Sequence, residues 1–147
     1  MRATIHTYIR HAVATISLAA TLAACSLSDT NQVETRAKQF ASNYFNLRYM
    51  QATNLCTSES RKWISYRASN ITQADLDVLN AQPDSATCEV VASCVADDSL
   101  ATVTMEVSHF LRCDTIGRPG HMCDKEEIEL SLKKVGKQWL IDISSPL

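Results

Sequence analysis

The spacing of apolar residues changes once along this chain, near residue 85, and that change limits the folds open to it. Before it, apolar residues at intervals of four and three form one series: Val33, Ala37, Phe40, Tyr44 and Leu47. This spacing places them on one face of an α-helix, which we expect over residues 32–50. After it, apolar residues recur at every second position, as in strands with one buried face. The sequence therefore predicts helices first and an antiparallel sheet second.

Two capping patterns mark predicted helix starts. Asn31 and Glu34 have the spacing of a capping box at the beginning of the first helix. Thr72 and Asp75 repeat that spacing before a short helix, which Pro83 ends. We expect a further helix between these two.

Four strands are predicted after residue 85, and each has an apolar face. The inward-facing sets are Cys88, Val90, Ala92 and Cys94; Val103, Met105 and Val107; Ile128, Leu130 and Leu132; and Trp139, Ile141 and Ile143. A turn at Asp97-Asp98 and a two-residue hairpin at Gly136-Lys137 connect the outer pairs. These turns set Cys88 against Val107, Ala92 against Val103 and Leu132 against Ile141. The middle connection needs an offset near 111–114 if Cys113 is to lie opposite Cys123.

Helices followed by a curled four-stranded sheet that ends in a tryptophan hairpin resemble the NTF2-like (cystatin-like) α+β roll. The resemblance covers about residues 31–145 and implies one domain, 31–147, with the helices packed on one face of the sheet. Some members of that family are isomerases or dehydratases with an acid and a base in a conical cavity. The available groups here are Tyr44, Tyr49, Tyr66, His109 and Asp142.

The predicted apolar face carries no carboxylate, so we expect a non-catalytic domain without catalytic, cofactor-binding or metal-binding residues. Such a domain would bind a small apolar ligand or a protein partner. A cavity enzyme that uses the tyrosine, histidine and aspartate groups is the alternative. A carboxylate or histidine that points into an open cavity would favour the enzyme.

The first 24 residues have the build of a secretory signal. Arg2 and Arg10 form a basic front, and residues 12–24 are uncharged and mostly apolar. A run of about 13 residues is too short to cross a bilayer, which needs about 20, but it suits a cleaved signal. A general secretory signal cut at Ala23-Ala24 is one interpretation.

Leu22-Ala23-Ala24-Cys25 at the end of this run resembles the lipobox of bacterial lipoproteins. The resemblance implies that Cys25 is acylated after cleavage and that 25–30 is a short tether to the membrane. Ser26, rather than an aspartate, follows the cysteine, which implies the outer membrane. The side that the domain faces stays open.

Removing the signal leaves 12 basic against 16 acidic residues, which gives the mature chain a formal net charge of −4. The basic residues are scattered and form no stripe with aromatic residues. Nucleic-acid binding is therefore not expected.

Five cysteines remain beside Cys25, in a compartment where disulfides persist. Cys113 and Cys123 flank a loop with glycine and proline, and a disulfide there is the simpler prediction. The alternative is a metal site formed by His109, Cys113, His121 and Cys123, although this spacing matches no familiar zinc module.

Among the other cysteines, Cys88 and Cys94 lie too far apart on one extended strand to bond each other. Cys56 belongs to the helical layer that must cover this strand, so it should bridge to one of them. We favour Cys56–Cys88 because Cys94 lies next to the Asp97-Asp98 turn.

Overall fold

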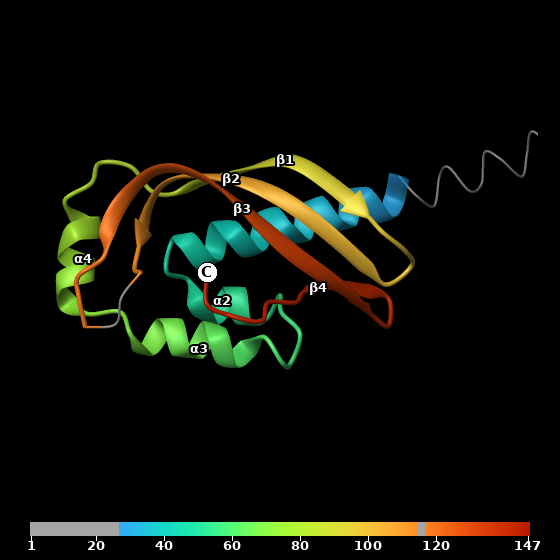
Figure 1. Cartoon of the computed structure of the whole chain (residues 1–147), viewed down its shortest axis with the longest axis horizontal. Helices are drawn as coiled ribbons and strands as arrows, with labels where there is room; N and C mark the ends of the chain where they lie inside the picture. Colours follow the sequence, from blue (N-terminus) through green and yellow to red (C-terminus); the bar gives the residue numbers. More distant parts are fainter. Residues whose placement is uncertain (1–26, 115–116) are drawn as a thin grey trace, which may run out of the picture.

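The computed structural model describes residues 27–114 and 117–147; the predicted signal and Cys25 lie outside them. A first helix covers 27–45 and is followed by three short helices, α2 (Tyr49–Thr53), α3 (Arg61–Ser69) and α4 (Gln73–Asn80). The strands are β1 (Thr87–Val95), β2 (Leu100–Arg112), β3 (His121–Val135) and β4 (Gln138–Ile141). They pair antiparallel in the order β1-β2-β3-β4 (Figure 1). The predicted α+β architecture is confirmed.

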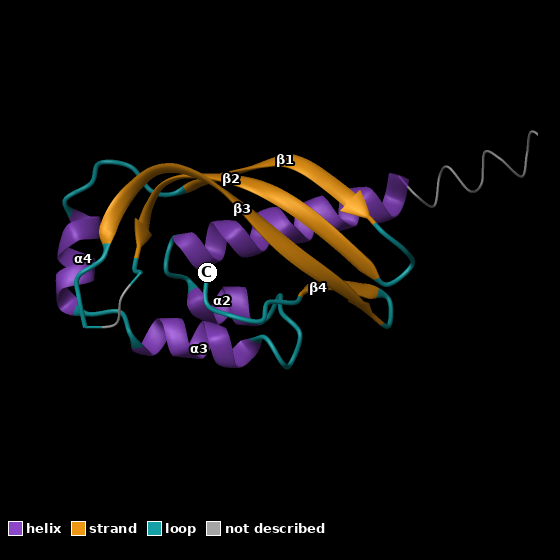
Figure 2. Cartoon of the chain, in the orientation of Figure 1, coloured by secondary structure: helices purple, strands orange, loops and turns teal. Residues whose placement is uncertain are grey.

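One apolar face of the first helix packs against the inner face of this sheet. Val33, Phe40 and Tyr44 are buried on the helix, as predicted. The predicted inward-facing residues of β2, β3 and β4 that are buried with them are Val103, Met105, Val107, Leu130, Leu132, Trp139 and Ile141. Burying each large apolar side chain contributes roughly 1.5–3 kcal/mol. Figure 2 shows the resulting layers, with the strands passing over the helices and α4 at one end of the sheet.

The first helix stops before Leu47, which adopts a left-handed backbone conformation with a φ of 58°. The Leu47 N–H donates to the Tyr44 carbonyl at 3.1 Å, and the Arg48 N–H donates to the Asn43 carbonyl at 2.8 Å. These two bonds form a Schellman motif, in which glycine usually occupies the place of Leu47. The helix predicted over 32–50 therefore ends about one turn early.

The capping box predicted at Asn31 is wrong, because the chain is already helical from residue 27. The Glu34 carboxylate instead accepts a hydrogen bond from Ser93 Oγ of β1 at 2.5 Å. The second predicted capping box is confirmed at the start of α4. There the Thr72 N–H donates to Asp75 Oδ2 at 2.7 Å, and Thr72 Oγ1 accepts from the Asp75 N–H.

The pairing of β1 with β2 shifts by one residue around Val91. Beyond this bulge, Ser93 rather than Ala92 lies opposite Val103. One extra residue in a strand turns every later side chain to the other face of the sheet. Cys94, which was predicted to face the core, is exposed for this reason.

The other predicted registers divide into confirmed and corrected ones. The pairs Cys88–Val107 and Leu132–Ile141 are confirmed, and Gly136 turns the last hairpin with a φ of 62°. The middle pairing runs without a shift, because every β2–β3 pair keeps the same alignment. It sets Phe110 opposite Cys123, so the expected offset near 111–114 is absent.

Candidate functional site: a cavity beside α3

A cavity of about 600 Å³ lies between α3, the end of β2, the middle of β3 and the C-terminal residues. Its apolar walls are Tyr66, Phe110, Ile128, Pro146 and Leu147. Its charged side chains are Arg67, Asp75, Arg112, Asp114 and Arg118. Small-molecule sites have this size and this combination of apolar walls with a few polar groups.

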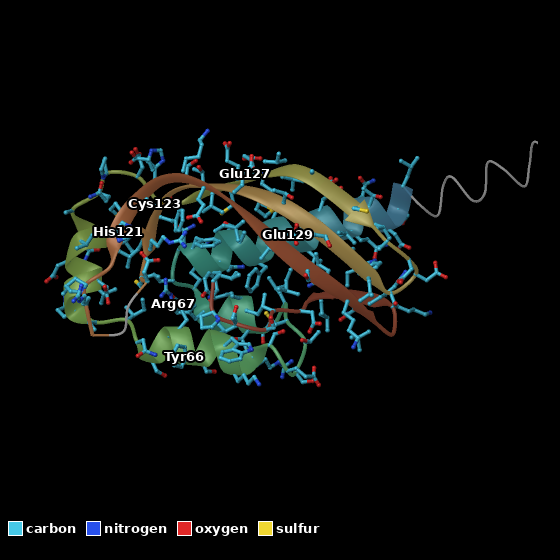
Figure 3. The ribbon with its side chains drawn as sticks, viewed as in Figure 1. Tyr66, Arg67, His121, Cys123, Glu127 and Glu129 are labelled. Carbon is cyan, nitrogen blue, oxygen red and sulfur yellow. The ribbon has the colours of Figure 1, made fainter. Side chains whose placement is uncertain are left out.

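Arg67 is the central charge of the cavity. It follows the buried Ile64 by three residues in α3, so both side chains lie on the same face of the helix. Arg67 Nη1 donates to the Cys113 carbonyl at 3.0 Å, just after β2 ends. The Nε atom is buried and has no hydrogen-bond partner among the described residues. Figure 3 shows Arg67 between α3 and the strands. Buried donors normally have partners, so this Nε–H is an unsatisfied donor on a residue that lines the cavity.

Two of the three guanidinium groups at the cavity form no ion pair with a carboxylate of the described residues. Arg112 Nε contacts Asp114 Oδ1 at 2.7 Å, and its Nη1 contacts the Glu126 carboxylate. Neither Arg67 nor Arg118 forms an ion pair with any residue in 27–114 or 117–147. Guanidinium groups bind carboxylates and phosphates through paired hydrogen bonds. Arg67 and Arg118 are therefore the groups in this cavity that could bind an anion.

Asp75 contributes a negative charge, but both of its oxygens are already used. Oδ1 accepts from the Gly120 N–H at 2.6 Å, and Oδ2 accepts from the backbone and hydroxyl of Thr72. Burial raises the pKa of Asp75, but the hydrogen bonds from Gly120 and Thr72, helped by the charge of Arg67, hold this pKa below its ordinary value. Asp75 is thus an ionised group that joins α4 to the chain before β3.

Tyr44, Tyr49 and Cys113, which lie near Arg67, are neutral at pH 7. Burial raises the pKa of Tyr44 and Tyr49, and the positive charge of Arg67 only partly opposes this. Burial also raises the pKa of the Cys113 thiol. A nucleophilic cysteine needs the thiolate form. Cys113 is therefore not an activated nucleophile.

The groups considered for catalysis do not converge on the cavity, although the Tyr44 and Tyr49 rings contact each other. Of the five, only Tyr66 lines the cavity. The Tyr44 hydroxyl is bonded to the backbone of Leu147 at 3.2 Å. Asp142 Oδ1 accepts a hydrogen bond from the Thr57 hydroxyl at 2.8 Å, which ties the chain after β4 to the helical layer.

The alternative metal site is not assembled either. His109 is exposed and has a φ of 55°, and Cys123 lies opposite Phe110 rather than beside Cys113. Within the described parts of the chain, no three or more His, Cys, Asp or Glu side chains are grouped to hold a metal ion.

The predicted Cys113–Cys123 disulfide is not formed; all five cysteines of the described ranges are free thiols. The pair Arg112–His121 aligns Cys113 with Gly120, three positions from Cys123. Three positions along a strand correspond to about 10 Å, whereas bonded cysteines have Cα atoms within about 7 Å. The register of β2 on β3 therefore keeps these thiols apart.

The predicted Cys56–Cys88 disulfide is also not formed. Cys56 forms a β-bridge with Ile141 at the β4 edge of the sheet, whereas Cys88 lies on β1 at the opposite edge. Both residues are buried separately. The Cys56 thiol is 3.3 Å from the Ala52 carbonyl, which accepts its hydrogen bond.

No helix within 27–114 or 117–147 is long and apolar enough to cross a membrane. The lipobox, Leu22 to Cys25, lies outside these residues. The sequence matches no protein-family model and no curated protein. The chemistry of the cavity is therefore the basis for the function proposed below.

Arg67 is the residue that sequence reasoning missed. Its signal is its position three residues after Ile64, because Ile64 is the one buried residue of α3. That spacing turns Arg67 inward although arginine usually faces solvent. Several of its neighbours in the cavity, such as Phe110 and Ile128, come from elements far along the chain.

Proposed function

We propose that this chain is an outer-membrane lipoprotein whose NTF2-like α+β domain binds a small anionic ligand without catalysing a reaction. The anchor is the acylated Cys25, which Leu22-Ala23-Ala24 and the apolar run before it support. Ser26 after the cysteine supports the outer-membrane address. No nucleic acid and no cofactor take part.

The state of Arg67 carries the binding proposal. Arg67 lines the cavity without an ion pair in the described ranges, and its Nε lacks a partner. A charge-assisted hydrogen bond to an ionised acceptor contributes about 1.5–3 kcal/mol. Arg118 lines the same cavity and adds a second positive charge.

The walls indicate what else the ligand carries. Phe110, Ile128 and Leu147 contribute apolar surface to the cavity that holds Arg67. A ligand with an anionic head and an apolar portion would use both features. A carboxylate with a short alkyl chain is the simplest compound of this kind.

Titration of the full-length protein in detergent with hexanoate tests the proposal. NMR should show hexanoate shifting the Arg67 Nε–H resonance, while hexylamine has no effect. Arg67→Gln should weaken hexanoate binding at least about tenfold, because a tenfold change corresponds to about 1.4 kcal/mol.

Arg61→Gln is the matched control, since Arg61 belongs to the same helix but is exposed and does not line the cavity. It should leave hexanoate binding unchanged. Equal binding of hexanoate and hexylamine, or full hexanoate binding by Arg67→Gln, would contradict the proposal.

A further inference from the structure

Most of β3 has a neighbouring strand on one side only. β3 spans His121–Val135, but β4 pairs only with Leu132–Val135. One more bond continues this ladder, from the Asp142 N–H to the Ser131 carbonyl at 2.9 Å. Among the described residues, no further strand lies beside β3 between α4 and β4 (Figure 1). The sheet therefore has an open edge along the first part of β3.

The chain leaves this edge because its last residues are held elsewhere. The Ile143 N–H donates to Ser60 Oγ at 2.9 Å, and the Leu147 backbone is bonded to the Tyr44 hydroxyl. Both bonds draw the C-terminal residues toward the helices. β4 is therefore not continued along β3 past Ser131.

The alternation of backbone groups identifies the donors and acceptors at the open edge. Ser131 points its carbonyl toward the β4 side, so Glu129 and Glu127, two and four residues earlier, point their N–H and C=O groups the same way. No residue in the described ranges bonds these groups. They form a template on which another extended segment could pair.

The cavity lies on the inner side of the same edge. Ile128, between the two glutamates, is half-buried and lines the cavity, and Arg67 lies across from it on α3. Side chains of a strand alternate between the two faces of a sheet. A strand added at Glu127 and Glu129 would therefore send every second side chain toward the cavity.

The charges without an ion pair have opposite signs on the two faces of this edge. Glu127 and Glu129 are exposed on the outer face and form no ion pair with a described residue (Figure 3). Glu106, opposite Glu127, contacts Lys125 at 2.9 Å. The inner face offers Arg67. A second copy of this chain would bring acidic edges together, whereas a peptide with basic outward side chains and an acidic inward one matches both faces.

We propose that the open edge of β3 at Glu127 and Glu129 binds an extended peptide, which adds an antiparallel fifth strand to the sheet. Its outward basic side chains contact the two glutamates, and an inward carboxylate binds Arg67. This inference rests on the anion-binding function proposed above and assigns a peptide as the ligand.

The peptide acetyl-KVKEKVK-amide tests this on the full-length protein in detergent. In an antiparallel pair, directly opposite residues share a face and exchange both backbone bonds at every second pair. The lysines, which share the outer face with Glu127 and Glu129, therefore point their N–H groups at β3. The valines and the glutamate point theirs away from it.

Two N-methylated forms of the peptide should therefore differ in their affinity for the protein. Methylating the lysine amides should abolish binding. Methylating the valine and glutamate amides should leave the affinity within about twofold of that of the parent peptide. Equal binding of the two forms, or weaker binding of the second form, would overturn strand addition. If hexanoate still binds and requires Arg67 in that case, the anion site stands and only the peptide is wrong.

Charge reversal on the edge provides a second readout. The double variant Glu127→Lys, Glu129→Lys should weaken binding of the parent peptide about fivefold or more. It should leave hexanoate binding unchanged. Glu89→Lys is the matched control, because Glu89 lies on β1 at the opposite edge and its side chain is exposed. An equal loss of peptide affinity in the double variant and in Glu89→Lys would overturn the proposal.

Discussion

Asp75 and Gly120, which are 45 positions apart in the chain, are joined by a 2.6 Å hydrogen bond from the Gly120 N–H to Asp75 Oδ1. The bond connects α4 to the segment that leads into β3, at one wall of the cavity. A Cβ atom at Gly120 would lie 2.8 Å from both the Arg112 carbonyl and the Cys113 thiol, so the chain approaches closely here. This contact positions two sides of the site.

Asp75 should make the protein more sensitive to acid. Burial raises the pKa of Asp75, but the hydrogen bonds hold it below its ordinary value. Its stabilising contribution is therefore complete above the unfolded pKa of about 3.9 and is lost as the pH falls through the lower folded value. Urea unfolding at pH 6 and pH 3 should show a larger loss of unfolding free energy for the wild type than for Asp75→Asn. Equal losses of unfolding free energy in the wild type and in Asp75→Asn would contradict this account.

Asn46 should matter more for stability than its neighbour Asn43. Asn46 Nδ2 donates to the Ala86 carbonyl and Oδ1 accepts from the Ala86 N–H, both at 3.0 Å. Asn46→Ala leaves both groups without their partner, so it should lower the free energy of unfolding by about 1–3 kcal/mol. Asn43→Ala, in the last turn of the first helix, removes only a bond to the Gln39 carbonyl and should lower the free energy of unfolding by less. Urea denaturation of both variants decides this, and equal losses would refute it.

The thiols should differ in reactivity. Burial raises the pKa of Cys56 to about 12 and that of Cys88 to about 11, whereas Cys94 is exposed. Because the thiolate is the reactive form, iodoacetamide at pH 8 should modify Cys94 well before the other two. Mass spectrometry of timed digests measures the order. A Cys56–Cys88 peptide pair found without reduction would contradict the free thiols of this structure.

Replacing Cys25 should detach the protein from the membrane. Cys25→Ser removes the thiol that the lipobox resemblance assigns for acylation, so the protein should leave the membrane fraction or stay uncleaved. Mass spectrometry of the wild-type N-terminus should find an acylated cysteine. A mature wild-type protein that starts at another residue would show that the lipobox is not used.

The sequence by itself determined which faces are buried. The inward positions on the first helix, such as Phe40, and on the last strands, such as Leu132 and Trp139, follow from local spacing. That spacing is set by the backbone geometry of each element, so it needs no knowledge of distant contacts. The Thr72–Asp75 capping box and the Gly136 hairpin were predictable for the same reason.

Only the tertiary structure decided where those patterns are interrupted and what converges on the cavity. Leu47 ends the first helix in a conformation usual for glycine, and the shift at Val91 turns Cys94 outward. Neither position carries a local signal, because leucine replaces the glycine usual at such a helix end and valine is typical of a regular strand. The cavity depends on contacts between elements that are distant in the chain. Arg67 and Ile128 are 61 positions apart and meet only because α3 packs beside the incompletely paired strand β3.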